Sequence, residues 1–144
     1  KLLPVPLLYL SAYFERYKDT YNDLMFNVSA EGAWVDWLQF FLEGVKVQAN
    51  DANVKARELL ALQKQWKTQV SQNKSIGRTL EVIDFLFEKP YITIPMVSKH
   101  IHISYPTAKK YLDILVKQGV LVTQPSVNYG KIYYASGIIS LLDK

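Results

Sequence analysis

The sequence predicts a mainly α protein with a small β-hairpin close to its C-terminal end. Apolar residues recur at helical spacing through most of the chain, and two short β-branched and aromatic runs occur only after residue 119. The composition, with 49% apolar and 21% charged residues among 144, is typical of a globular protein. The polar segment 69–75 separates two patterns of element length. We therefore expect two domains, at residues 1–73 and 74–144.

The sequence of the first domain predicts three helices. A first helix is expected over residues 6–17, and a second one begins with Asp19 as its N-cap and ends at Gly32, where glycine suits the left-handed stop position. Residues 33–72 contain no Pro and carry apolar side chains on alternating steps of three and four. They predict one long helix, or two nearly collinear helices that meet near residues 50–51.

The start of this long helix is apolar on more than one face. A helix that is apolar all round is buried all round, and the two short helices before it offer too little surface to cover it. We therefore expect either upstream sequence or a second copy of the chain to cover this helix. The residues that we assign to a homodimer contact are Trp34, Trp37, Phe40 and Phe41.

The sequence of the second domain predicts shorter helices and strands. We expect three helices, then two strands that form a hairpin with a seven-residue loop, then one last helical turn. Thr93 and Ser104 are placed to cap the second and third of these helices. The expected ranges are 79–88, 94–101, 105–118, 120–123, 131–135 and 138–142. This order of elements is that of a winged helix-turn-helix.

Charge is distributed unevenly along the chain. Residues 1–73 carry eight Lys or Arg and eight Asp or Glu, whereas residues 74–144 carry nine basic and five acidic side chains. The formal net charge of +4 therefore belongs to the second domain. Between Lys89 and Lys131 there are six lysines and a single acid, Asp113. The chain is therefore asymmetric, with a neutral apolar first half and a basic second half.

The expected helix 105–118 has an apolar face and an opposite face that is polar and mostly basic. In helix-turn-helix proteins the second helix of the pair enters the major groove, and its N-terminal residues contact base edges. We therefore predict double-stranded DNA as a partner, although an ordinary solvated helix face and a protein-interaction module are the alternatives. The expected base readers are Ser104, Tyr105, Thr107 and Lys110, and the expected phosphate contacts are Lys109, Lys117 and Lys131.

The sequence offers no catalytic or metal-binding constellation. Its two histidines, His100 and His102, cannot share one helical face, there is no Cys, and the carboxylates of the first domain are scattered. We expect no cofactor, no metal and no enzymatic activity. No apolar run reaches the roughly 18 residues of a membrane span, and no secretory leader is present. We therefore expect a cytoplasmic protein without a membrane partner.

The first domain contains the stretch Trp34-Val-Asp-Trp-Leu-Gln-Phe-Phe-Leu-Glu-Gly-Val45, preceded by residues 6–14 and 17–24. This stretch is similar to the pattern W..WL.FFL.GV, and with the two preceding segments it resembles the C-terminal part of Fic-family proteins, which are AMP-transferases and their relatives. Many bacterial members carry a winged helix after this point, which residues 107–112 and 131–134 resemble. The resemblance covers roughly residues 2–142.

The family's catalytic motif, HPFxxGNGRxxR, does not occur in this sequence, whose first histidine is His100. Its inhibitory pattern, (S/T)xxxE(G/N), is also not found, because Asn27 stands four residues before Glu31. The resemblance implies a C-terminal fragment of a protein AMP-transferase, whose catalytic part precedes Lys1. The expected function is DNA binding that serves autoregulation or targeting of this enzyme. The alternative is a protein-interaction or dimerisation module that presents target proteins to the catalytic part.

Overall fold

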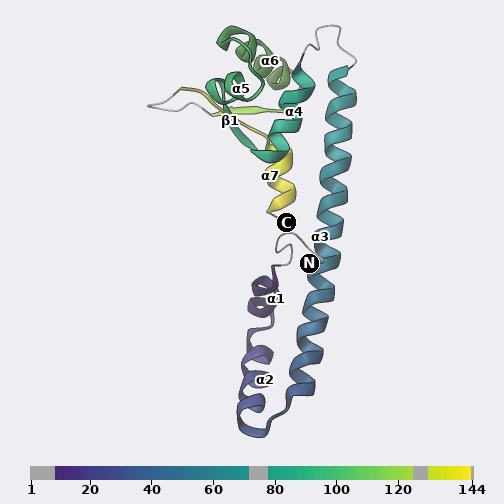
Figure 1. Cartoon of the computed structure of the whole chain (residues 1–144). Helices are drawn as coiled ribbons and strands as arrows, with labels where there is room; N and C mark the ends of the chain where they lie inside the picture. The colour runs from purple at the N-terminus through teal and green to yellow at the C-terminus, as the bar shows by residue number, and fades with distance from the viewer. Residues whose placement is uncertain (1–8, 72–77, 125–129, 144) are drawn as a thin grey trace. The chain divides into compact units, whose positions relative to one another are not determined.

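The computed structural model describes residues 9–71, 78–124 and 130–143. These residues form seven helices and three short strands in the order α1-α2-α3-α4-β1-α5-α6-β2-β3-α7 (Figure 1). The predicted mainly α fold class with a small hairpin is therefore confirmed. The chain folds into two compact units, Lys1–Ala56 and Arg57–Lys144.

The limit between the two units falls inside helix α3 (Trp34–Ser71), upstream of the boundary expected after residue 73. The last turns of α3 belong to the second unit because Trp66 and Val70 are buried in its core. The side chain of Asp84 holds the same stretch, accepting a hydrogen bond of 2.8 Å from Gln63 and pairing with the Lys67 ammonium at 2.5 Å.

The first unit contains α1 (Leu10–Arg16), α2 (Lys18–Glu31) and the first part of α3. The expectation that Asp19 caps α2 is wrong. Helix α2 follows α1 directly, so Tyr17 occupies the N-cap position without a side-chain cap, and Asp19 lies in the first turn. An acidic side chain there still favours the positive end of the helix dipole. The expected start of α1 near residue 6 lies outside the described residues.

Two other expectations for the first unit are confirmed. Gly32 ends α2 with a φ of 68°, and its N–H donates to the carbonyl of Val28. Helix α3 is a single continuous helix of 38 residues, which decides between the two alternatives left open by the sequence.

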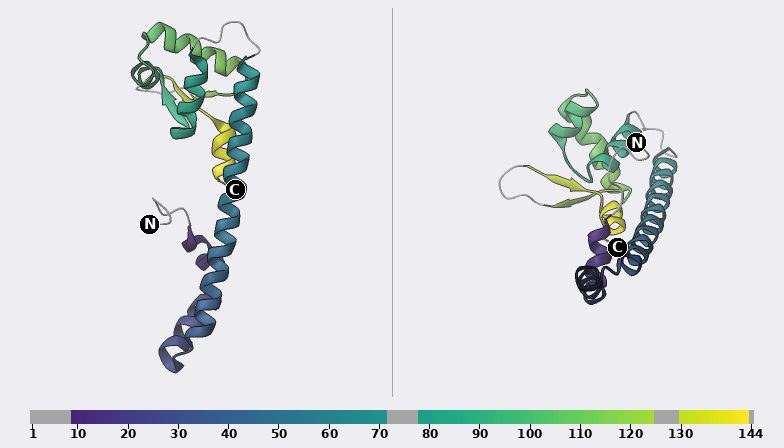
Figure 2. Two further views of the ribbon diagram at one scale, coloured as in Figure 1. Left: turned by 45° about the vertical axis from the view of Figure 1, so that its right-hand side comes forward. Right: turned by 60° about the horizontal axis from the view of Figure 1, so that its bottom comes forward.

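The second unit is built from α4, α5, α6, α7 and a three-stranded antiparallel sheet (Figure 2). Its helices are α4 (Thr79–Glu88), α5 (Ile94–His100), α6 (Tyr105–Lys117) and α7 (Ser136–Leu142). Its strands are β1 (Tyr91–Thr93), β2 (Val122–Gln124) and β3 (Ile132–Tyr134). Strand β3 lies in the middle, so that Tyr134 is opposite both Tyr91 and Val122.

The sheet differs from the expected two-stranded hairpin. Strand β1 was not predicted, because it has only three residues and passes directly into α5. Strand β2 begins two residues later than expected, because Val120 and Leu121 are buried in the core and donate their N–H groups to the carbonyl of Leu115. The hairpin residues 125–129 lie outside the described residues.

One apolar core holds the second unit together. It receives side chains from the end of α3, from every helix of the unit and from strands β1 and β3. The central phenol is Tyr133, which is fully buried between its sheet neighbours and the helices. Helices α5 and α6, joined by the turn 101–104, lie against this core and place one face of α6 in solvent.

Candidate nucleic-acid interface

Helix α6 is amphipathic, with one face in the core and one in solvent. Its buried residues are Ala108, Leu112 and Leu115. The side chains of Lys109, Lys110 and Lys117 are exposed. The burial of Ala108, Leu112 and Leu115 agrees with the apolar face that the sequence predicted, whereas Tyr105 of that face is exposed.

The lysines of α6 are not neutralised by neighbouring acids. Among the residues that the structure describes, no carboxylate forms an ion pair with Lys109, Lys110 or Lys117. The one acid of this helix, Asp113, is half-buried. Three positive charges on one exposed helix face can therefore meet an anionic ligand without first breaking an ion pair.

The N-terminus of α6 is closed by a side-chain cap. The Ser104 hydroxyl accepts a hydrogen bond of 3.4 Å from the backbone N–H of Thr107, and the two hydroxyls lie 2.8 Å apart. The expected cap is thus confirmed, and these two expected base readers hydrogen-bond each other. Tyr105, in contrast, is 54% exposed. Its ring therefore offers a larger exposed surface to a ligand than the two hydroxyls at this end of the helix.

Two side chains hold the turn between α5 and α6. The guanidinium of Arg78 donates to the carbonyl of Ile101, and the hydroxyl of Ser98 donates to the carbonyl of Ile103 at 2.6 Å. Between these two carbonyls, His102 adopts a left-handed conformation with a φ of 52°. Arg78 could not be identified from the sequence, because its partner Ile101 is far from it along the chain and no motif links them.

Arg78 is itself held by Glu81. The carboxylate of Glu81 accepts hydrogen bonds from Nε and Nη2 of Arg78 at 2.6 Å and 2.5 Å. This hydrogen-bonded guanidinium lowers the pKa of the Glu81 carboxyl, with a smaller contribution from His100. The two-point contact fixes the plane of the guanidinium.

Lys131 lies apart from α6 along the chain, at the start of β3. It is exposed, and its ammonium lies 5.9 Å from the ring centroid of the buried Tyr133. Burial raises the pKa of the Tyr133 phenol, and the charges of Asp113 and Tyr105 add to this shift. The charges of Asp113 and Tyr105 on α6 therefore act on a residue of β3.

The aromatic residues of the first unit are divided between an internal cluster and an exposed face. Trp37, Phe40 and Phe41 are half-buried, and their ring centroids lie 6.1, 5.9 and 6.5 Å from that of Phe14 in α1. Trp34 is 58% exposed. Of the four residues expected at a dimer contact, three therefore pack within the chain and one faces solvent.

We call the exposed residues Trp34, Val35, Leu38 and Leu42 the apolar face of α3. Each is at least half exposed. Their spacing of one, four and eight residues places them on one side of the helix. The sequence predicted that α3 is apolar on more than one face. It did not distinguish the residues of α3 that α1 and α2 bury from those that stay exposed to solvent.

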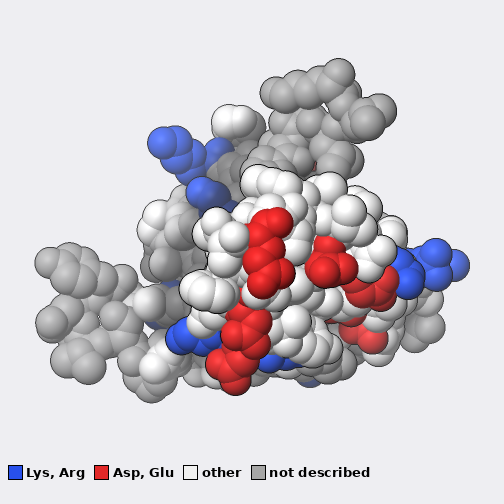
Figure 3. Space-filling view, turned by 90° about the horizontal axis from the view of Figure 1, so that it is seen from below, with Lys and Arg blue, Asp and Glu red and all other residues white. Residues whose placement is uncertain are grey.

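The two units carry opposite charge. Residues 1–56 contain five Lys or Arg and seven Asp or Glu, and residues 57–144 contain twelve and six. Figure 3 shows acidic side chains gathered on the face seen from below. The net positive charge of the chain therefore belongs to the second unit.

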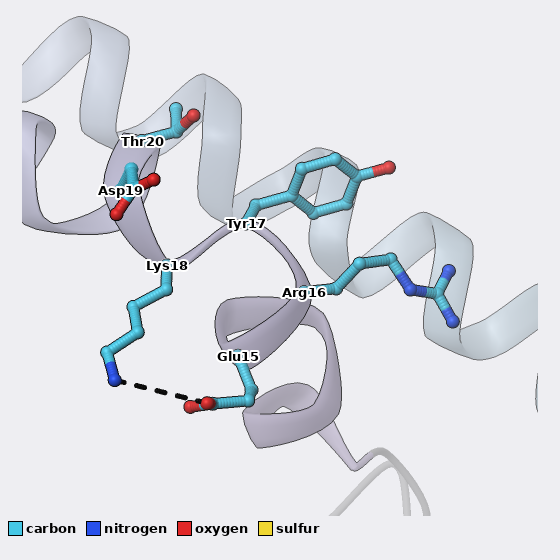
Figure 4. A pocket seen from close by; sticks show the side chains of 6 residues that line it. All are labelled: Glu15, Arg16, Tyr17, Lys18, Asp19 and Thr20. Carbon is cyan, nitrogen blue, oxygen red and sulfur yellow. Dashed lines mark ion pairs between the residues drawn. The ribbon is translucent and has the colours of Figure 1, made fainter.

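A hollow on the surface of the first unit lies where α1 meets α2. The hollow at the α1–α2 junction is lined by exposed residues, and its one ion pair, between Glu15 and Lys18, spans 4.0 Å (Figure 4). Arg16 and Tyr17 extend away from this pair. Within the described ranges, no cluster of three or more His, Cys, Asp or Glu is placed to hold a metal.

The described helices also lack membrane-spanning character. None of them combines the length and the apolar character needed to cross a bilayer. Helix α3 is long enough, but charged and amide side chains interrupt its second half.

The described residues define a protein with a helical, aromatic-rich first unit and a mainly α second unit that exposes a cationic helix. Residues 62–135 match the family model of the C-terminal domain of SoFic-like protein adenylyltransferases. This match covers half of the chain, and the chain belongs to this family. The Fic-family membership predicted from residues 34–45 is therefore confirmed, although the matched region lies further along the chain. A C-terminal domain of this kind is not by itself the catalytic part of an adenylyltransferase.

Proposed function

We propose that the second unit is a winged helix domain that binds double-stranded DNA through the exposed face of α6. This proposal is supported by three exposed lysines of α6, Lys109, Lys110 and Lys117, which have no acidic partner among the described residues. Neutralising phosphates with such lysines releases counterions from the duplex, which is the main source of affinity for DNA.

The proposed docking puts the N-terminal half of α6 in the major groove. Tyr105 and Lys110 then lie close to base edges, and Lys109, Lys117 and Lys131 lie close to phosphates. The hydrogen bond between Ser104 and Thr107 gives these two hydroxyls a structural role in the free protein. Each is left with further hydrogen-bonding capacity for a base or a phosphate.

We assign this DNA binding to the regulation or targeting of a protein adenylyltransferase. The family match supports the link to adenylyl transfer, because the matched domain is described as the C-terminal domain of such enzymes. DNA binding by this part then serves either control of the enzyme's own gene or its recruitment to DNA-bound targets.

A titration of the chain with a labelled DNA duplex at several salt concentrations tests the proposal. We expect binding at low salt that weakens linearly on a log–log plot as salt rises. Replacing Lys109, Lys110 and Lys117 together by Gln should abolish it. Replacing three lysines outside α6, Lys18, Lys46 and Lys64, by Gln removes the same charge and should leave most of the binding.

The outcomes of this titration are distinct. Binding that both triple variants weaken equally would show a general charge effect and contradict a role for α6. No binding of the parent chain at low salt would contradict DNA binding altogether.

A second proposal concerns the first unit, which we infer to be a protein-interaction module. It is supported by the apolar face of α3, on which Leu42 is 62% exposed and Val35 is 67% exposed. Contiguous exposed apolar surface generally marks a contact with another protein. The partner that we propose is a second copy of the chain, and the catalytic part of an adenylyltransferase or one of its target proteins is the alternative.

Sedimentation of the chain at micromolar concentration tests this second proposal. We expect a dimer, which Leu42→Gln should dissociate. Leu60→Gln is a matched control, because Leu60 lies on the same helix and is 65% exposed. A monomeric parent chain would exclude the homodimer, and equal effects of the two substitutions would exclude the apolar face as its contact.

A further inference from the structure

We propose that Arg78 is a positioning residue that sets the orientation of α6 for DNA, and that Glu81 is the residue that orients Arg78. This inference rests on the proposed DNA-binding function. It assigns a role in DNA affinity to two residues that lie on neither α6 nor the hairpin.

Arg78 connects three parts of the second unit. It occupies the N-cap position of α4, its guanidinium donates to the Ile101 carbonyl in the turn before α6, and its backbone N–H donates to the Tyr111 hydroxyl of α6 at 3.4 Å. A single residue thus joins α4 to both the beginning and the middle of α6. Loss of its side chain frees the turn while the buried face of α6 stays in the core.

The carbonyl of Ile101 depends on Arg78, whereas the hydroxyl and the carbonyl of Ser98 hold Ile103 on the other side of the turn. Helix α5 ends at His100, and the residue at the centre of the turn, His102, is in the left-handed region that a non-glycine residue seldom adopts. Ile101 is 3% exposed, so its carbonyl loses its donor in a poorly hydrated place if Arg78 is removed. We therefore expect the backbone on either side of that carbonyl to change conformation so that the carbonyl finds another hydrogen-bond donor.

The hydrogen bonds of Arg78 identify it as a positioning residue rather than a phosphate contact. Its Nε, Nη1 and Nη2 atoms all donate within the protein, two of them to the carboxylate of Glu81. The ion pair with Glu81 cancels the charge that would attract a phosphate. Lys109 and Lys110, by comparison, have no such acidic partner among the described residues.

The two roles predict opposite effects for the substitution Glu81→Gln. If Arg78 contacted phosphate, removing the competing carboxylate would free a positive charge and strengthen DNA binding. If Arg78 positions α6, the same substitution releases the guanidinium from its fixed plane and weakens DNA binding, even though the net charge rises by one unit.

The test compares duplex affinity of Arg78→Gln, Glu81→Gln and the double variant with that of the parent chain, using a labelled mixed-sequence duplex of about two helical turns. We expect Arg78→Gln to weaken binding about tenfold, which corresponds to about 1.4 kcal/mol. Glu81→Gln should weaken it to a smaller extent, and the double variant should be no weaker than Arg78→Gln alone, because both act through one contact.

Two controls complete the experiment. Arg57→Gln removes the same charge from an exposed position on α3 and should have little effect. Arg78→Lys retains the positive charge, but its ammonium lacks the planar fork that contacts Glu81 and Ile101 together, so its affinity should lie between those of the parent and Arg78→Gln. Thermal unfolding by circular dichroism shows whether each variant is folded at the titration temperature. If Arg78→Gln is unfolded there, the affinity of Arg78→Lys is compared with that of the parent chain instead.

The possible results separate this inference from the proposed function. A parent chain that does not bind the duplex refutes the proposed function. A parent chain that binds, with Arg78→Gln no weaker than Arg57→Gln, refutes the positioning role alone. Stronger binding by Glu81→Gln also refutes it, and loss of that gain in the double variant makes Arg78 a phosphate contact.

Discussion

Gly44 is a position in the first unit where the addition of a single methyl group is predicted to destabilise the protein. It lies in α3 where the ring of the buried Tyr13 from α1 crosses the helix. A Cβ atom added to Gly44 would lie 2.7 Å from Cδ1 and 2.9 Å from Cε1 of that ring. The ring also contacts Phe40 and Tyr17, so it cannot turn aside without moving other aromatic residues. The substitution Gly44→Ala therefore has two effects on stability, and they act in opposite directions.

The first effect favours alanine, because Ala in a helix interior is more stable than Gly by about 1 kcal/mol. The second effect opposes it, because overpacking of a filled site costs about 1–3 kcal/mol. The two contacts below 3.0 Å place Gly44→Ala at the upper end of that range. We therefore expect a net loss of about 2 kcal/mol in the free energy of unfolding of the first unit, by difference of these two values.

Urea unfolding followed by circular dichroism and tryptophan fluorescence measures this loss. Asn50→Ala, at an exposed position on the same helix, is the control and should be neutral or slightly stabilising. In a Tyr13→Ala background the ring is gone, and Gly44→Ala should then stabilise the protein. The reasoning is refuted if Gly44→Ala stabilises the parent chain, or if its cost is the same with and without the ring.

Three further predictions concern function and pH. Lys110→Ala should cost about 1–3 kcal/mol of DNA affinity and relax preference at one base pair, whereas Lys117→Ala should weaken all duplexes alike and lower the salt slope by about one unit; titrations on specific and random duplexes distinguish them. The purified chain with ATP and Mg²⁺ should transfer no labelled AMP to any protein, because it lacks the phosphate-binding loop and base of the Fic motif, and any labelled product contradicts this. Arg78 lowers the pKa of Glu81 from its ordinary value of 4.5, so the contribution of this pair to stability is present above that value and disappears as pH falls through the lower folded-state pKa. The difference in melting temperature between the parent and Glu81→Gln should therefore vanish in acid, and a difference that persists there contradicts the assignment.

The helices could be predicted from the sequence wherever a periodic apolar pattern continued over several turns. Helix α4 occupies the expected residues 79–88, and the cap of α6 is the expected Ser104. Strand β1 could not be predicted, because three residues are too few to show alternation and its pairing with β3 depends on residues far along the chain. Helix ends and short strands are thus decided by tertiary contacts.

The same distinction applies to the candidate site. The exposed lysines of α6 follow from helical periodicity, which assigns each residue to a face. The role of Arg78 does not follow from periodicity, because its hydrogen bond to Ile101 joins residues on different elements. The packing of Trp37 against Phe14 is likewise a contact between helices, so the sequence alone overstated how much of α3 remains open.

Contact between the exposed face of α6 and double-stranded DNA can be tested residue by residue. The isotopically labelled chain is titrated with a duplex at low salt, and the backbone amide NMR shifts are followed. We predict the largest changes at residues 104–110, smaller changes at Lys117 and Lys131, and none in α2. A titration that shifts only residues of the first unit, or shifts none at all, would contradict DNA binding by α6.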